Sequence, residues 1–354
     1  MVIEGLLSIW LAIDLFSTFL VFSRVFNGGF MVLILSEEDV VKVLSFKDAI
    51  DSIERALLLQ SSGEAQIIPR SRIYMKSSVL HVMASSLEPL DVAGLKTYLS
   101  TRERTVFVVL LFSISRGELL AVIEGDILGR IRTGAASAIA TKYLARADSS
   151  VLGVIGSGRQ AYTQALAISR VRDFDRILVV SQDASNAENM VRALREKGLK
   201  AFRSDSIESV SRESDVISTA TNSRNPFLKA EWIKKGAHVN LVGSNHPSRS
   251  EAYPDLFLRS RLIVTDSIEQ AKRESGDLIE AVKQAYITWE NIHELWEVVS
   301  GRVRRQSDEE VTIFKSHGVA LWDIAVARIV YEKALENGLG REVDFKGFWR
   351  DRFF

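Results

Sequence analysis

The sequence contains no cysteine, which excludes disulfide bonds, thiolate nucleophiles and zinc sites built on cysteine. Its five histidines are scattered, and no two are spaced as His-x-x-x-His, so a zinc enzyme is not expected and we predict no metal site. The 45 basic and 45 acidic residues cancel, leaving no net charge to attract nucleic acid or anionic lipid. We therefore expect no nucleic-acid partner, and the lack of cysteine fits a reducing compartment such as the cytoplasm.

Proline is also rare, with 5 residues in a chain of 354. A content of 47% hydrophobic and 25% charged residues is typical of a globular protein and excludes a disordered or fibrous chain. At roughly 100–200 residues per domain, this length predicts about two domains.

The chain opens on an apolar stretch, residues 6–22, that is interrupted by Asp14. A secretory signal needs positive charge before such a stretch, yet Glu4 lies there and no small-residue cleavage site follows. A spanning helix needs about 20 residues without an interior carboxylate. We therefore interpret residues 1–30 as an appendage or a mis-assigned start, with folding beginning near Met31 and a membrane partner not expected. The alternative is an amphipathic anchor or partner helix, which would tether the protein to a membrane.

Residues 31–147 have the pattern of a small α+β unit. Ser36 with Asp39 and Ser45 with Asp48 form capping boxes that predict two helices, the second ending at Gly63. Short runs rich in β-forming residues follow at 71–75, 78–83, 95–99, 105–113 and 119–124. They predict a mostly antiparallel sheet. The next helix, 126–146, is rich in glycine and alanine, which lets another backbone approach closely, so we expect it between layers or domains.

From residue 151 the pattern changes to alternating strands and helices. We expect strands at 151–155, 176–180, 215–221, 238–243 and 261–266, with helices beginning at Arg159 and Ala184. Alternation at this spacing predicts a parallel, doubly wound sheet and an α/β protein. The amphipathic helix 322–338 follows this unit and is expected to pack back onto the first one.

The strongest motif is the glycine turn between the first strand and helix of the second unit. Gly156 permits a tight turn, Gly158 lets a pyrophosphate approach the backbone, and Ala161 allows close packing of helix on strand. The pyrophosphate then lies at a helix N-terminus, where free N–H groups favour anions. This context predicts a dinucleotide site for NAD or NADP, and its predicted contacts in the turn include Ser157, Arg159 and Gln160.

The choice between NAD and NADP stays open. Ser181 stands at the end of the second strand, where an acidic ligand of the NAD ribose is expected, and Asp183 follows two residues later. Asp183 is either a ribose contact or the N-cap of the next helix. No arginine adjoins to demand the 2′-phosphate of NADP.

Several segments together carry a resemblance to a known family. In chain order they are LILSEEDV, IIPRSRIYM, LHVMASSLEPLDVAGLKTY, GRIRTGAASAIATKYLAR, VIGSGRQA, GAHVNLVGSN and RRQSDEEVTIFKSHGVALWDIAVA. Over residues 31–340 the chain resembles the ornithine cyclodeaminase/μ-crystallin family. The resemblance implies a Rossmann-type domain and NAD(P)-dependent redox chemistry at the Cα of small amino acids: ornithine cyclisation to proline, alanine dehydrogenation or cyclic ketimine reduction. It also implies a homodimer formed by pairing of the first-domain sheets.

The resemblance divides the chain and assigns its functional residues. It implies a substrate-binding and dimerisation domain formed by 31–147 with 319–354, and a Rossmann domain formed by 148–318. Arg70, Lys96 and Arg132 fall where the family holds the substrate carboxylate. A bidentate arginine can orient a carboxylate, and a lysine can stabilise charge at the reacting nitrogen. Arg72 is the alternative to Arg70 as a carboxylate ligand, because it lies two residues along the same strand and therefore on the same face. Further expected positions are the cofactor contacts Thr133, Thr221 and Ser316, with Gly318 near the nicotinamide and Asp323 either at the domain junction or at a helix N-terminus.

Two positions depart from the family's cyclodeaminases. Asn245 replaces an aspartate that the family's cyclodeaminases and alanine dehydrogenases carry. That aspartate can act as a base, whereas an asparagine can only orient by hydrogen bonds. His81 replaces a glutamate that faces the distal amine of ornithine. His81 and His246 are candidate proton-transfer groups, and a plain strand histidine is the alternative for His81. We therefore expect a dehydrogenase or imine reductase acting on a small amino or imino acid. A strict ornithine cyclodeaminase is the first alternative, and a non-catalytic, crystallin-like dinucleotide-binding protein is the alternative from another class.

Overall fold

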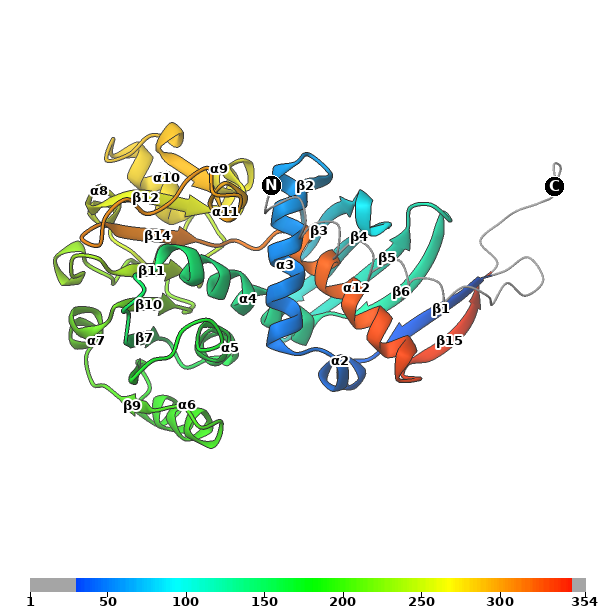
Figure 1. The fold of residues 1–354 in the computed structure, drawn as a ribbon, viewed down its shortest axis with the longest axis horizontal. Coiled ribbons are helices and arrows are strands. Elements are labelled where there is room, and N and C mark those ends of the chain that lie inside the picture. The colour runs from blue at the N-terminus through cyan, green and yellow to red at the C-terminus, as the bar shows by residue number, and fades with distance from the viewer. Residues whose placement is uncertain (1–29, 346–354) are drawn as a thin grey trace, which may run out of the picture.

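The computed structural model describes residues 30–345, which form two sheets with helices packed around them. Figure 1 shows the two sheets side by side, with α4 and the connection from β14 to α12 running between them. The predicted appendage, residues 1–30, lies outside the described residues except for Phe30, which begins the first strand. Within 30–345, no helix has the length and apolar character needed to cross a bilayer.

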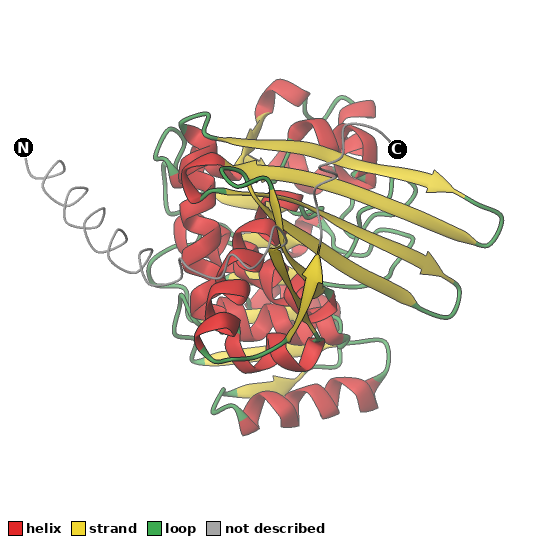
Figure 2. Cartoon of the chain, turned by 90° about the vertical axis from the view of Figure 1, so that its right-hand side faces the viewer, coloured by secondary structure: helices red, strands yellow, loops and turns green. Residues whose placement is uncertain are grey.

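The first sheet has seven strands in the order β15-β1-β6-β5-β4-β3-β2. All neighbours are antiparallel except β1 and β6, which run parallel. Long hairpins dominate this sheet, as the yellow arrows of Figure 2 show. The strands are β1 (Phe30–Leu35), β2 (Ala65–Tyr74), β3 (Ser78–Leu87), β4 (Val92–Thr101), β5 (Thr105–Ser113), β6 (Glu118–Glu124) and β15 (Arg341–Phe345).

The second sheet has eight strands in the order β13-β12-β14-β11-β10-β7-β8-β9, and every neighbouring pair is parallel. Its carboxyl ends form one edge, where open parallel sheets bind ligands. The strands are β7 (Val151–Ile155), β8 (Arg176–Val180), β9 (Ala201–Arg203), β10 (Val216–Thr219), β11 (His238–Leu241), β12 (Ser260–Thr265), β13 (Ile292–Glu294) and β14 (Val311–Lys315). The doubly wound α/β architecture predicted from sequence is confirmed.

Helices cover both sheets and join them. Helix α12 leaves the parallel sheet and packs against α3 and strands β3 and β4 of the first sheet, as predicted. Helix α4 packs between α3 and α5 and contacts β11, so its small residues do lie between the two halves. The helices are α2 (Glu37–Val43), α3 (Phe46–Ser61), α4 (Asp126–Leu144), α5 (Arg159–Ile168), α6 (Ala184–Glu196), α7 (Ile207–Glu213), α8 (Asp255–Arg259), α9 (Ile268–Glu274), α10 (Gly276–Lys283), α11 (Leu295–Val299) and α12 (Ala320–Glu336).

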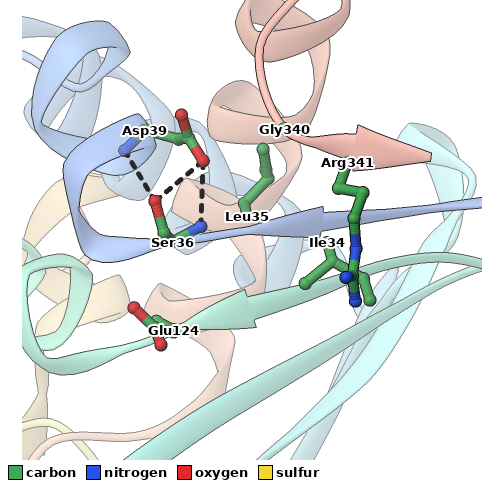
Figure 3. A pocket seen from close by; sticks show the side chains of 7 residues that line it. All are labelled: Ile34, Leu35, Ser36, Asp39, Glu124, Gly340 and Arg341. Atoms are coloured by element: carbon green, nitrogen blue, oxygen red, sulfur yellow. Dashed lines mark hydrogen bonds between the residues drawn. The ribbon is translucent and has the colours of Figure 1, made fainter. Parts of the chain in front are cut away.

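Local capping signals in the sequence were reliable guides to helix starts. Ser36 and Asp39 form the predicted capping box, with the Ser36 hydroxyl donating to the Asp39 carboxylate over 2.8 Å (Figure 3). The same side chains line a pocket of about 290 Å³ between β1, β6 and β15. Helix α4 has Gly125 as its N-cap and is capped instead from α2, where Glu37 accepts from the N–H groups of Asp126 and Ile127 at 2.6 and 2.9 Å.

The predictions from sequence were less accurate for elements that carry no local signal of where they begin or end. The predicted strand 71–75 begins earlier, at Ala65, because its first residues are half polar and gain their order from pairing with β3. Helix α12 begins at Ala320, two residues before the predicted start. Strands β9, β13, β14 and β15 were not predicted, since each has only three to five residues and depends on a neighbouring strand.

Candidate functional site

A cavity of about 370 Å³ lies between the two sheets. Strands β3, β4 and β5 and helix α4 supply one side, and loops that follow β11 and β14 supply the other. The cavity brings together residues that were predicted for the site although they are far apart in the sequence: Arg70, His81, Lys96, Arg132, Thr133, Gln160, Asn245, Ser316 and Gly318. Other lining residues are Tyr98, Ser100, Thr105, Phe107, Gly125, Asp126, Gly129, Arg130, Val242 and His317.

Two of the predicted cations share a buried carboxylate. Asp323 Oδ1 accepts from Lys96 Nζ at 2.7 Å and from Arg132 Nε at 3.0 Å, and the Asp323 side chain is fully buried. Neither Nη1 nor Nη2 of Arg132 makes a hydrogen bond to another described residue. Arg132 is thus a buried, partly unsatisfied cation, and not the solvated helix charge that its position in the sequence alone would suggest. Asp323 supports these cations and does not merely compensate the dipole of α12.

Burial and charge set the ionisation of this group. Burial lowers the pKa of Lys96 to about 8, with Asp323 opposing that change and Arg132 adding to it. Burial disfavours the charged form of Asp323, but the adjacent Arg132 and Lys96 hold its pKa below the ordinary value. Lys96 therefore combines a positive charge at neutral pH with a proton that it can release near pH 8.

Arg70 is held in a second buried ion pair. Its Nη1 donates to Glu274 at 2.5 Å, and its Nη2 donates to the carbonyls of His317 and Gly318 at 2.9 and 3.0 Å. Arg72 reaches the other oxygen of Glu274 at 2.7 Å, but does not line the cavity. Both arginines of β2 thus bridge to α9, and only Arg70 contributes to the cavity wall.

The register of the first sheet aligns one wall of the cavity. Arg72, His81, Tyr98 and Phe107 pair in that order across β2, β3, β4 and β5, so they share a face. The rings of His81 and Tyr98 stack at 4.1 Å between centroids with an interplanar angle of 8°. Burial, with help from Arg72 and Arg70, lowers the pKa of His81 to about 4, so this ring is neutral at physiological pH. This wall of the cavity is therefore aromatic, and His81 adds no charge to it.

Asn245 and His246 lie in the loop after β11. Asn245 lines the cavity, and its backbone carbonyl accepts from Nη2 of Arg72 at 3.1 Å. His246 does not line the cavity; its Nδ1 pairs with the Ser248 hydroxyl at 2.8 Å within the loop. Of these two neighbours, the structure therefore brings only Asn245 to the site.

The glycine turn fits a dinucleotide. Gly156 has φ +118°, and a Cβ there would lie 2.6 Å from the carbonyl of Ala220, so no other residue suits this turn. A Cβ at Gly158 would meet nothing within 4 Å, which leaves open space at the N-terminus of α5. An unfilled space against free helix N–H groups is suited to a pyrophosphate. Ser157 and Arg159 flank this space, and Gln160 links it to the cavity lining.

The remaining predicted cofactor residues do not line the cavity. Ser181 follows β8, and its hydroxyl accepts from that of Ser157 at 2.8 Å. Asp183 is the N-cap of α6, and one of its oxygens accepts from the N–H groups of Ser185 and Asn186 at 2.8 and 3.1 Å. Thr221 follows β10 and binds Glu251 through its hydroxyl at 2.8 Å. Asp183 therefore has the capping role that the sequence left open, with one carboxylate oxygen engaged.

Three supporting residues were missed at the sequence level. Glu274 pairs with both arginines of β2, and Gln270 donates to Glu274 at 3.2 Å and to the Gly318 carbonyl at 2.8 Å. Asp266 accepts from the N–H groups of His317 and Gly318; burial opposes its ionisation, but His317 and these donors hold its pKa at about 2. The position of Asp266 after a predicted parallel strand is a usable signal, whereas Glu274 and Gln270 lie in a helix with no local sign of their role.

Comparisons with known proteins agree with this geometry. The model of the "Ornithine cyclodeaminase/mu-crystallin family" matches residues 31–338. An alanine dehydrogenase of Archaeoglobus fulgidus is 36% identical over 322 residues, which are 88% of this chain and 98% of the relative. The Δ1-pyrroline-2-carboxylate reductase of Thermococcus litoralis, solved with NADH and L-proline, is 36% identical with a TM-score of 0.85, covering 88% of this chain and all of that one. An archaeal alanine dehydrogenase dimer with bound NAD is 35% identical with a TM-score of 0.85, covering 89% of this chain and all of that one.

Proposed function

Because this chain belongs to the ornithine cyclodeaminase/mu-crystallin family, we propose that it is an NAD(P)-dependent oxidoreductase acting at the Cα of a small amino or imino acid. The reaction favoured by the cavity is the reduction of a cyclic imino acid, of the kind named for the reductase relatives, and alanine dehydrogenation is the second member of the same class. The observation that carries the proposal is the convergence of Arg70, Lys96 and Arg132 on one small cavity.

The three cations suit a substrate carboxylate. Arg132 has two nitrogens without a partner among the described residues, and Lys96 uses one hydrogen bond on Asp323. A buried guanidinium with unused donors gains about 1.5–3 kcal/mol per hydrogen bond to a charged group. Gln160 and Ser316, which are predicted cofactor contacts, line the same cavity, so a carboxylate held by Arg132 and Lys96 would share that cavity with the nicotinamide.

The chemical step then needs a hydride and a proton. When bound, the nicotinamide supplies the hydride to Cα in the reductive direction and accepts it in the oxidative direction. Reduction of the C=N bond also places a proton on the nitrogen, and Lys96, with a pKa of about 8, is placed to donate it. Asn245 orients the substrate by hydrogen bonds, and neutral His81 closes the aromatic wall. In the reverse direction the same groups yield an imine, which water hydrolyses.

The cavity is less suited to ornithine cyclodeamination. The distal ammonium of ornithine needs a carboxylate, and Asp126 is the acidic residue among the described cavity lining. Asp126 already pairs with Arg130 and Arg159, each at 3.2 Å. With a neutral His81 and with Asn245 as an amide, the wall offers that ammonium no free anion. This argument favours imine reduction or dehydrogenation over a strict cyclodeaminase.

The proposal includes a division of the chain into two domains. Residues 31–147 with 319–354 would bind substrate and form the dimer, and residues 148–318 would bind the dinucleotide. The two sheets support this division, since β15 returns from the end of the chain to pair with β1.

We propose that the chain forms a homodimer through the outer face of the first sheet. Ile73, Leu80, Leu99 and Val106 pair across β2 to β5 on the face opposite His81 and Tyr98. Ile73, Leu99 and Val106 are 59%, 40% and 52% exposed, and an apolar row of this kind favours association. The solved alanine dehydrogenase relative is itself a dimer. We expect sedimentation equilibrium to give twice the chain mass, and Leu99→Lys to lower it; a monomeric unmodified chain would contradict the proposal.

The cofactor choice gives a specific prediction at Ser181. Asp183 is held as the cap of α6 through one of its oxygens, and the residue directly after β8 is Ser181, which offers a hydroxyl in place of the carboxylate that would repel a 2′-phosphate. We expect Ser181→Asp to lower the ratio of kcat/KM for NADPH to that for NADH by about tenfold, because about 1.4 kcal/mol of repulsion gives that factor. Asn186→Asp, an isosteric change at an exposed residue in the first turn of α6, is the matched control. An unchanged ratio in Ser181→Asp would remove Ser181 from the ribose site.

The function itself is tested by nicotinamide absorbance. In the reductive direction, purified protein is mixed with NADH or NADPH and either Δ1-pyrroline-2-carboxylate or pyruvate with ammonia. In the oxidative direction, it is mixed with NAD+ or NADP+ and ornithine, L-proline or L-alanine. Oxidation of the cofactor with the cyclic imine is the expected result. Proline and ammonia from ornithine without net cofactor change would identify a cyclodeaminase, and cofactor binding without turnover of any member would favour the non-catalytic alternative.

A further inference from the structure

A second cluster of buried charges lies outside the cavity lining and apart from the group formed by Lys96, Arg132 and Asp323. The side chains of Lys315 and Asp277 are fully buried and lie 3.0 Å apart, and Glu251 is also fully buried. None of the three lines the cavity. Burying these charges costs free energy, because the loss of hydration offsets much of the attraction between them. We therefore asked which part of the molecule the cluster holds in place.

The cluster clamps both ends of the loop that carries Asn245. Lys315 Nζ donates to the carbonyl of Ser244 at 2.7 Å, the residue directly before Asn245. At the far end, Asp277 accepts from the N–H groups of Glu251 and Ala252 at 2.7 and 3.0 Å. Glu251 in turn accepts from the N–H of Gly243 at 2.8 Å.

The same cluster reaches the proposed cofactor side. Glu251 accepts from the N–H and hydroxyl of Thr221 at 2.9 and 2.8 Å. Residues 221, 244 and 315 follow or end β10, β11 and β14, which are neighbours in the parallel sheet (Figure 1). The cluster therefore links the carboxyl ends of three neighbouring strands of that sheet.

We infer that Lys315 is a positioning residue for the substrate: it holds the Ser244 carbonyl so that Asn245 faces the cavity. This inference rests on the proposed function, in which Asn245 orients the substrate. Lys315 acts at a distance, since it touches the loop backbone and neither substrate nor cofactor.

A double-mutant cycle tests the inference, with Δ1-pyrroline-2-carboxylate and NADH as the probes. Lys315→Met and Asn245→Ala are each expected to raise KM for the imino acid by about tenfold, and the double variant to be no worse than the worse single variant within about twofold. The Kd of NADH, followed by fluorescence, should stay within about threefold. Lys234→Met is the matched control, because Lys234 pairs with Asp215 at 2.7 Å elsewhere and should leave KM unchanged.

The outcomes separate the inference from the proposed function. If Asn245→Ala alone leaves KM unchanged, the role of Asn245 in the proposed function fails. If both single variants are impaired and their effects multiply, or if folded Lys315→Met has an unchanged KM, the inference about Lys315 is overturned. Lys315→Met leaves Asp277 without its counter-ion, so Lys315→Met with Asp277→Asn provides a second, charge-balanced variant. If circular dichroism shows both versions unfolded, Lys315 acts in folding and the inference is also overturned.

Discussion

Replacing Lys96 by methionine is expected to lower kcat/KM for the imino acid by about a thousandfold, while the Kd of NADH stays within about threefold. The substitution keeps an unbranched side chain that is one atom shorter, and it removes the ammonium group proposed both to bind the substrate carboxylate and to donate the proton. It also leaves Asp323 with Arg132 as its remaining partner, at 3.0 Å. Steady-state kinetics and fluorescence titration of NADH measure the two quantities separately.

Lys142→Met is the matched control for this result. Lys142 lies on α4 and pairs with Glu54 at 2.7 Å on the surface, so its loss should change kcat/KM by less than about twofold. Equal loss of turnover and of NADH affinity in Lys96→Met would contradict the assignment of Lys96 to the substrate.

The dependence of kcat/KM on pH in the unmodified enzyme should also reflect the role of Lys96. Burial lowers the pKa of Lys96 to about 8, so the ammonium is present below pH 8 and is lost as pH rises through that value. If the ammonium binds and protonates the substrate, kcat/KM for imine reduction falls about tenfold per pH unit above pH 8. The residual activity of Lys96→Met should lack this limb. His81, with a pKa of about 4, predicts no further change between pH 5 and 7.

Replacing Gly318 by alanine should lower kcat/KM by about a hundredfold, through the misplacement of Arg132. Gly318 has φ +79°, and a Cβ there would collide with the guanidinium of Arg132. The Gly318 carbonyl also accepts from Arg70 at 3.0 Å, so a shift of this loop disturbs two of the three proposed carboxylate ligands, Arg70 and Arg132. We expect the loss to appear mainly in KM for the imino acid.

Gly338→Ala is the control that separates the effect of backbone strain from the effect of the collision with Arg132. Gly338 has φ +63°, and a Cβ there would meet nothing within 4 Å, so its replacement carries the strain of about 1–2 kcal/mol alone. Urea unfolding should show both variants destabilised, and kinetics should show Gly338→Ala fully active. If the two variants lose the same activity, strain and not contact with Arg132 explains the effect.

Local signals in the sequence determined much of this protein. The capping boxes at Ser36 and Ser45 and the glycine turn at Gly156 act within one turn of helix or one loop, so short-range chemistry is enough to predict them. Alternating strands and helices likewise predicted the parallel sheet. The resemblance of several segments then indicated the family and the residues Arg70, Lys96 and Arg132.

The tertiary structure alone decided how those residues are held. Lys96 and Asp323 are 227 positions apart, and Arg70 and Glu274 are 204 apart, so no periodicity or motif links them. Burial in the cavity wall is what lowers the pKa of Lys96 and makes His81 neutral, and burial results from the packing of both sheets. The clamp from Lys315 to Ser244 also exists only because β14 lies beside β11. A sequence indicates which side chains are available, whereas desolvation and long-range pairing depend on where the folded chain places them.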